Sequence, residues 1–175
     1  MIKRFPFLLF LLLVAGSSRA QFDTTFAKAN ILNCADSLVK AFKTKDWVLY
    51  TRYSYPALVG AMGGTDAFIS YVSANLSRIP DSAWKKYETG RVLQVIKTPG
   101  DLQAIIEINS VVEWLNMRIS TTHHLVAESW DGGLFWTFFD SQNDPVASTL
   151  IKPDLSDQLI IPKKVETMEP VKERN

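Results

Sequence analysis

The residue pattern changes at Pro80, and this change constrains the fold more than any other feature of the chain. Before Pro80, apolar residues from Phe26 to Phe42 recur at steps of three and four, which predicts a helix over about 24–44. Tyr55-Pro56 and Gly63-Gly64 then supply helix-ending signals. Further helices are therefore expected over 46–53, 56–62 and 66–78.

After Pro80 the sequence is typical of strands. The expected strands cover 87–97, 102–114, 117–130 and 134–140, with Leu159–Ile161 as a short closing strand or a packed extension. Thr98–Asp101 predicts a turn, and Asp131-Gly132-Gly133 predicts a hairpin. Helices followed by an antiparallel meander indicate an α+β fold, with the N-terminal helices packed on a curved antiparallel sheet.

The first 20 residues have the order of a cleavable signal peptide. A basic start at Lys3-Arg4 precedes an apolar run, and Ser18 and Ala20 occupy the positions of a small-residue cleavage site. The run is about half of the ~20 residues that a spanning helix needs, so the mature chain is expected to have no membrane span. We expect an exported protein, periplasmic or secreted after cleavage near Ala20. One domain over 21–161 and a loose charged tail over 162–175 would follow.

Charge and cysteine content narrow the classes of partner. Without Lys3, Arg4 and Arg19, the 19 basic residues of the chain become 16 against 18 acidic residues, a formal net charge of −2. Such a domain lacks the positive footprint of a nucleic-acid-binding protein. The single cysteine, Cys34, allows no internal disulfide and lies in a helical stretch, so a buried thiol is expected.

Several stretches together resemble secreted bacterial members of the nuclear transport factor 2-like superfamily. They are Ala41–Trp47, Tyr53–Pro56, Met62–Gly64, Trp130–Gly133 and Phe135–Asp140. The resemblance implies a cone-shaped α+β fold with a pocket between helices and sheet. That superfamily includes isomerases, dehydratases and cyclases as well as binding domains without catalysis, so the fold alone selects no function.

The hairpin register decides which histidine meets Asp140. A two-residue Asp131-Gly132 turn places His123 opposite Asp140, and a three-residue loop places His124 there, whereas a Gly132-Gly133 turn places Leu125 there. A carboxylate beside an imidazole would orient it as a general base. His123 lies on the more apolar side of its strand, so His123 and Asp140 are the candidate catalytic pair. Neighbouring histidines in a strand point to opposite faces, and no metal site is expected.

The remaining candidate residues are aromatic. Ligand pockets are lined mainly by apolar side chains with few polar groups. The predicted ligand pocket consists of Trp47, Tyr53, Tyr55, His123, Trp136, Phe138 and Asp140, and Tyr50 and Trp84 are further candidates for its lining. No cofactor-binding motif is present, and no cofactor is expected.

Three functions follow as hypotheses. The first is a non-catalytic exported domain that binds a small apolar ligand or forms a homodimer through its sheet. The second is an accessory or structural protein of the cell envelope. The third is a lyase or isomerase acting on a small hydrophobic substrate.

Overall fold

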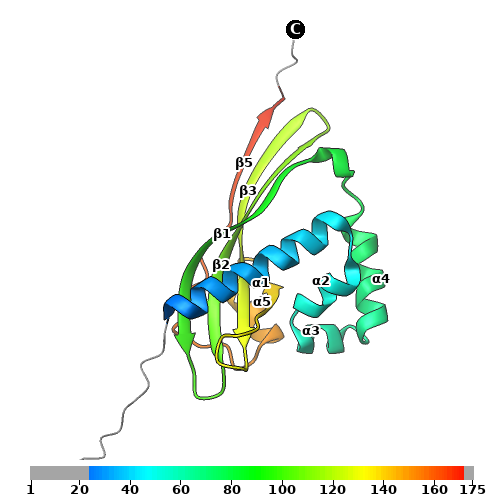
Figure 1. Ribbon diagram of the computed structural model, residues 1–175. Helices are drawn as coiled ribbons and strands as arrows, with labels where there is room; N and C mark the ends of the chain where they lie inside the picture. The colour runs from blue at the N-terminus through cyan, green and yellow to red at the C-terminus, as the bar shows by residue number, and fades with distance from the viewer. Residues whose placement is uncertain (1–23, 172–175) are drawn as a thin grey trace, which may run out of the picture.

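The computed structural model describes residues 24–171 and confirms the predicted α+β class, with the N-terminal helices packed against a curved antiparallel sheet (Figure 1). The predicted signal peptide, residues 1–20, lies outside the described residues. Within the part of the chain that the structure describes, no helix has the length and apolar character needed to cross a membrane.

The helices lie close to their predicted positions. They are α1 Thr24–Thr44, α2 Trp47–Tyr53, α3 Pro56–Ala61 and α4 Thr65–Leu76. Asp46 caps α2 by accepting a hydrogen bond from the amide of Leu49, at 2.9 Å. Gly63 and Gly64 both have positive φ, which lets the chain turn sharply between α3 and α4.

The sheet is built around two long central strands. A short 3-10 helix, η1 (Asp81–Ala83), leads into β1 Trp84–Lys97, β2 Leu102–Trp114, β3 Met117–Ser129 and β4 Thr137–Asp140, which pair in that order. The final strand, β5 Val165–Pro170, also pairs with β3. β4 and β5 therefore share one edge of β3, with β4 along Leu125–Glu128 and β5 along Met117–Thr122.

In the half of the sheet that contains β4, both faces are covered by other parts of the chain. On one face, α1 packs Ile31, Ala35 and Leu38 against side chains of β2, β3 and the chain around β4. On the other face, the helix α5 (Pro145–Ile151) and the segment that follows it cover Ile105 and Val126. Cys34 is buried in the first of these cores, as predicted, and burial raises the pKa of its thiol.

The connection between β3 and β4 is not the predicted tight hairpin. Leu125 lies opposite Asp140, so neither histidine faces that carboxylate directly, and β4 begins at Thr137 rather than at Leu134. The reason is Asp131, whose side chain accepts hydrogen bonds from the amides of Leu134 and Phe135, both at 3.0 Å. These amides are used inside the loop, and the strand starts later.

The C-terminal region is more ordered than predicted. The expectation of a loose tail is wrong for Val165–Pro170, which forms β5 along β3. Leu159–Ile161 forms no strand but a packed extension, with Leu159 buried against the outer face of the sheet. The short helix α5 was not predicted. Its start is explained by Asp144, which caps it, and by Pro145 in its first turn.

Candidate functional site

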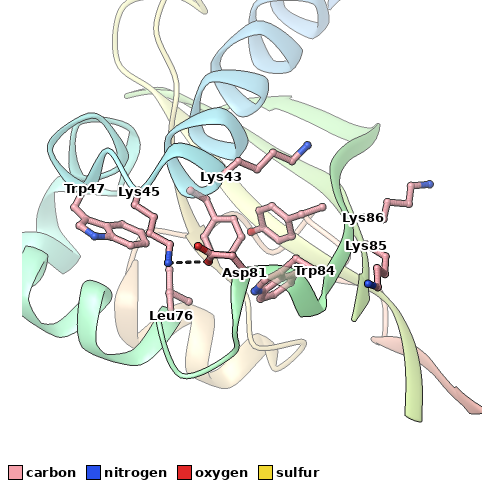
Figure 2. Close-up of a pocket in the computed structure, with 10 residues that line it drawn as sticks. Lys43, Lys45, Trp47, Leu76, Asp81, Trp84, Lys85 and Lys86 are labelled. Carbon is pink, nitrogen blue, oxygen red and sulfur yellow. Dashed lines mark ion pairs between the residues drawn. The ribbon is translucent and has the colours of Figure 1, made fainter. Parts of the chain in front are cut away.

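A pocket of about 260 Å³ lies where the end of α1, α2, the end of α4 and the start of β1 meet (Figure 2). It is lined by Phe42, Lys43, Lys45, Trp47, Leu76, Asp81, Trp84, Lys85, Lys86 and Tyr87. Two features of the sequence create it: the tight corner between α1 and α2, and the turn into β1 through η1. Together they place side chains of the α1–α2 corner, such as Lys45 and Trp47, across from side chains of η1 and β1, such as Asp81 and Trp84.

Three aromatic rings form one wall of the pocket. Phe42, from α1, contacts Trp84 edge-to-face with ring centroids 5.0 Å apart and contacts Tyr87 at 4.4 Å. Trp84 and Tyr87, both from β1, lie 5.5 Å apart. Aromatic pairs in such arrangements stabilise one another beyond simple burial. The wall is therefore a closely packed aromatic surface, and Trp47 and Leu76 lie across from it.

The mouth of the pocket carries charge. Lys45 pairs with Asp81 at 2.7 Å, joining the α1–α2 corner to η1, and the two side chains are 42% and 72% exposed (Figure 2). Lys85 and Lys86 have their ion-pair partners, Glu113 and Glu88, outside the lining. Lys43 makes no ion pair with any residue of 24–171. The lining thus holds four lysines and one aspartate.

Behind the aromatic wall lies a group of polar side chains. Burial, and then the charge of Asp140, raise the pKa of Tyr50 to about 12. Burial is also the main cause that raises the pKa of Tyr87, and Tyr50 and Asp140 add to it. Both phenols therefore stay protonated beyond the pH at which an ordinary phenol ionises, and neither acts as a base near neutral pH.

The candidate pair His123 and Asp140 lies on the helix side of the sheet, diagonally across two strands. His123 Nε2 is 3.9 Å from Asp140 Oδ2, longer than a hydrogen bond. Burial lowers the pKa of His123, although Asp140 acts in the opposite direction, so the imidazole is neutral at pH 7. His124 lies on the opposite face and is buried beside Asn143. The two histidines therefore point apart, as predicted.

The other predicted pocket residues do not meet at one site. Trp47 lines the pocket, and Tyr53 is half-buried and stacks on Phe135 at 5.2 Å. Trp136 and Phe138 are buried in the core beneath α1, with 0% and 2% exposure, and leave no surface for a ligand. Tyr55 lies in the core on the face of the sheet opposite α1. The chain reaches that face by passing the edge of β4, where the amide of Tyr55 donates to the carbonyl of Phe138.

The sequence prediction missed most of the pocket. Trp84 was a further candidate for the predicted pocket, whereas Phe42 belonged to the apolar face of the first predicted helix. Tyr87 marked only the start of a strand. One sequence feature did point to the pocket: Trp47 follows closely after the end of the first predicted helix, so an aromatic side chain was expected where the chain turns between two helices.

A second polar cluster lies on the face of the sheet opposite α1, and nothing in the sequence pattern indicated it. Lys152 has no exposed surface, and its ammonium binds the carboxylates of Asp101, at 2.8 Å, and of Glu128. It also pairs with Asp154 at 3.0 Å. Gln103 completes the cluster by donating to Asp101 and by accepting from the amide of Ser156 at 2.8 Å.

One ammonium, that of Lys152, faces three carboxylates in this cluster, and burial and hydrogen bonds shift the pKa values of these groups. Burial raises the pKa of Glu128, and hydrogen bonds from Lys152 and Trp130 partly oppose this rise. Burial acts in the same direction on Asp101, but hydrogen bonds from Lys152 and others outweigh it and hold its pKa below the usual range. The same carboxylates raise the pKa of Lys152 above its usual value against the effect of burial. The arrangement fixes the segment after α5 to the sheet.

Among residues 24–171, no group of three or more His, Cys, Asp or Glu side chains is arranged to hold a metal ion. Comparison of the chain with protein-family models, with curated proteins and with solved structures finds no match.

Proposed function

We propose that this chain is an exported, non-catalytic domain that binds a small apolar ligand in the pocket between α1, α2, α4 and β1. The observation that carries the proposal is the wall formed by Phe42, Trp84 and Tyr87, with Trp47 across from it. Ligand pockets combine such apolar walls with a few polar groups. A volume of about 260 Å³ lies just below the usual range of about 300–1,000 Å³ and favours a compact ligand of two or three rings.

A lyase or isomerase activity finds less support. A general base needs an orienting partner within hydrogen-bond distance, and His123 and Asp140 are 3.9 Å apart. The ionisable groups at the mouth of the pocket, Lys45 and Asp81, are both open to solvent, with 42% and 72% exposure. Membership of the nuclear transport factor 2-like superfamily and export remain part of the proposal, and the α+β architecture is compatible with both.

The test is binding of N-phenyl-1-naphthylamine, a neutral apolar fluorophore. We expect saturable fluorescence enhancement and a rise in melting temperature, because a ligand that binds the folded state stabilises it. Leu76→Trp would fill the pocket and weaken binding at least tenfold. Leu150→Trp is the matched control, since Leu150 is 80% exposed on α5. Absence of saturable binding, or equal binding by Leu76→Trp, would contradict the proposal.

Self-association through the sheet is a second candidate, and a specific observation favours it. The upper end of the sheet projects past α1 (Figure 1), and its helix-side face exposes Trp114 and Met168 by 43% and 60%. Light scattering coupled to size exclusion tests this directly. A dimer that Trp114→Ser and Met168→Ser convert to a monomer would support association through this face, whereas a monomeric parent chain would exclude it.

A further inference from the structure

We propose that the ligand of this pocket is an aromatic or aliphatic anion, and that Lys45 binds its anionic group by exchanging Asp81 for it. The inference rests on the proposed binding function and adds the chemical class of the ligand. Its starting point is the Lys45–Asp81 ion pair, which spans the mouth of the pocket beside the aromatic wall (Figure 2).

The backbone places Lys45 at a position that glycine normally occupies. The amide of Lys45 donates to the carbonyl of Phe42 at 3.2 Å, and the amide of Asp46 donates to the carbonyl of Ala41 at 2.9 Å. This is the hydrogen-bond pattern that ends a helix with one residue in the left-handed conformation, and Lys45 has a φ of 56°. A side chain with a β-carbon is unfavourable there.

The ion pair with Asp81 does not account for this conformation. Lys45 is 42% and Asp81 72% exposed, and an ion pair that solvent reaches in this way contributes little to folding because solvent screens it. A residue held in an unfavourable backbone conformation is a reason to look for a function of its side chain. At this corner, the function available to the Lys45 ammonium is to bind a group at the mouth of the pocket.

The charges around the mouth indicate the sign of that group. The lining contains Lys43, Lys45, Lys85 and Lys86 against Asp81 alone. Glu88 and Glu113 neutralise Lys86 and Lys85 from outside, which still leaves one positive charge in excess. An aromatic pocket alone would also suit a cation, but these lysines repel one. The combination therefore fits an apolar body with one carboxylate or sulfonate.

An incoming anion would compete with Asp81 for Lys45. The Asp81 carboxylate is 72% exposed, so releasing it to solvent costs little. The anionic group would then take its place, while the apolar body covers Phe42, Trp84 and Tyr87. The burial of that body against the rings supplies most of the affinity, and Lys45 supplies the preference for negative charge.

The test compares two probes that differ in a single group. 1-Anilinonaphthalene-8-sulfonate carries a sulfonate, and N-phenyl-1-naphthylamine is the same molecule without it. Both are titrated into the full chain at low ionic strength. We expect the anionic probe to bind about two- to fivefold more tightly, the range that one partly exposed ion pair supplies. Added salt reduces this ratio because it screens the charges.

Three variants make the test specific, and far-UV circular dichroism checks that each is folded. Lys45→Gln brings the ratio of the two affinities to about one. Asp81→Asn raises the ratio, because the competing carboxylate is gone. Lys40→Gln is the control: Lys40 is an exposed lysine on α1, five residues before Lys45 and outside the pocket, and the ratio is expected to stay at its original value.

The two proposals fail in different ways. If neither probe binds, the binding function itself is overturned. If the neutral probe binds and the anionic probe binds no more tightly, the pocket stands and the anion preference is overturned. A preference that survives Lys45→Gln would overturn the role of Lys45.

Discussion

Replacing Lys152 with methionine tests the energetics of the buried charge cluster. Methionine has a similar shape and no charge, so the change removes the ammonium and leaves Asp101 and Glu128 buried without a counter-charge. Both carboxylates are almost fully buried, at 6% and 1% exposure. Removing one partner of a buried ion pair costs about 3–5 kcal/mol, because the remaining charge is neither solvated nor compensated.

This loss is large on the scale of the whole domain. Domains of this size have free energies of unfolding of about 5–15 kcal/mol, so the variant would lose a substantial part of its stability. Urea unfolding followed by far-UV circular dichroism measures the loss directly. Lys163→Met is the matched control because Lys163 is exposed, and its expected effect is within about 0.5 kcal/mol.

The loss should depend on pH in a defined direction. Glu128 already has a raised pKa in the folded protein, and without Lys152 that pKa rises further. A carboxyl group whose folded pKa exceeds its unfolded pKa takes up a proton first in the folded state, which favours folding as the pH falls. The destabilisation by Lys152→Met is therefore largest at pH 7–8 and becomes smaller towards pH 5.

A triple variant completes the test. Lys152→Met with Asp101→Asn and Glu128→Gln removes all three buried charges together, and it should recover most of the lost stability. A loss below about 1 kcal/mol for Lys152→Met alone would refute the reasoning. A loss that is the same at pH 5 and pH 8 would show that packing, not uncompensated charge, is its cause.

Three further predictions concern the backbone and His123. Lys45→Gly should raise the free energy of unfolding by about 0.5–1 kcal/mol, because glycine suits the positive φ at this helix end. The same variant should lose the preference for the anionic probe. A lower free energy of unfolding than that of the parent chain would contradict the backbone argument. Gly90→Ala should destabilise the domain by about 1–3 kcal/mol, since a β-carbon there would lie 2.7 Å from the β-carbon of Glu107. Gly60→Ala, in α3 where the space around the glycine is open, should stabilise the domain by about 0.4–1 kcal/mol. The urea assay described above measures both changes. The pKa of His123, followed by NMR of its ring protons, should lie below the ordinary value because burial disfavours the charged ring. Since the folded state resists protonation, His123 should destabilise the domain as the pH falls below about 6.5, and His123→Gln should weaken that loss.

The helices and the fold class could be predicted because their signals are local. The three- and four-residue spacing in 24–44 and the breaks at Pro56 and Gly63-Gly64 are visible in the sequence, and α1 to α4 begin and end within about two residues of the predicted positions. The same applies to β3, where alternation placed His123 on the more apolar side of its strand, the side of Leu125 and Ala127. Leu125 and Ala127 do lie in the core beneath α1.

The rest depends on contacts between distant residues. The turn after β3 was misread because Asp131 holds the amides of Leu134 and Phe135, and a side chain that bonds forward along the chain changes the register. Lys152 could not be paired with Asp101 and Glu128 from sequence, because they are far apart along the chain. The pocket was only partly predicted, since Trp47 and Trp84 meet through the positions of α1 and η1.

The shared edge of β3 has a consequence for synthesis of the chain on the ribosome. β4 covers Leu125–Glu128 soon after β3 is made, but Met117–Thr122 waits for Val165–Pro170, the last described strand. During that interval, half of β3 presents unpaired amides and carbonyls that a neighbouring chain could pair with. β5 is then the element that closes the growing sheet against aggregation. A nascent chain halted before residue 165 would be the species most in need of a chaperone.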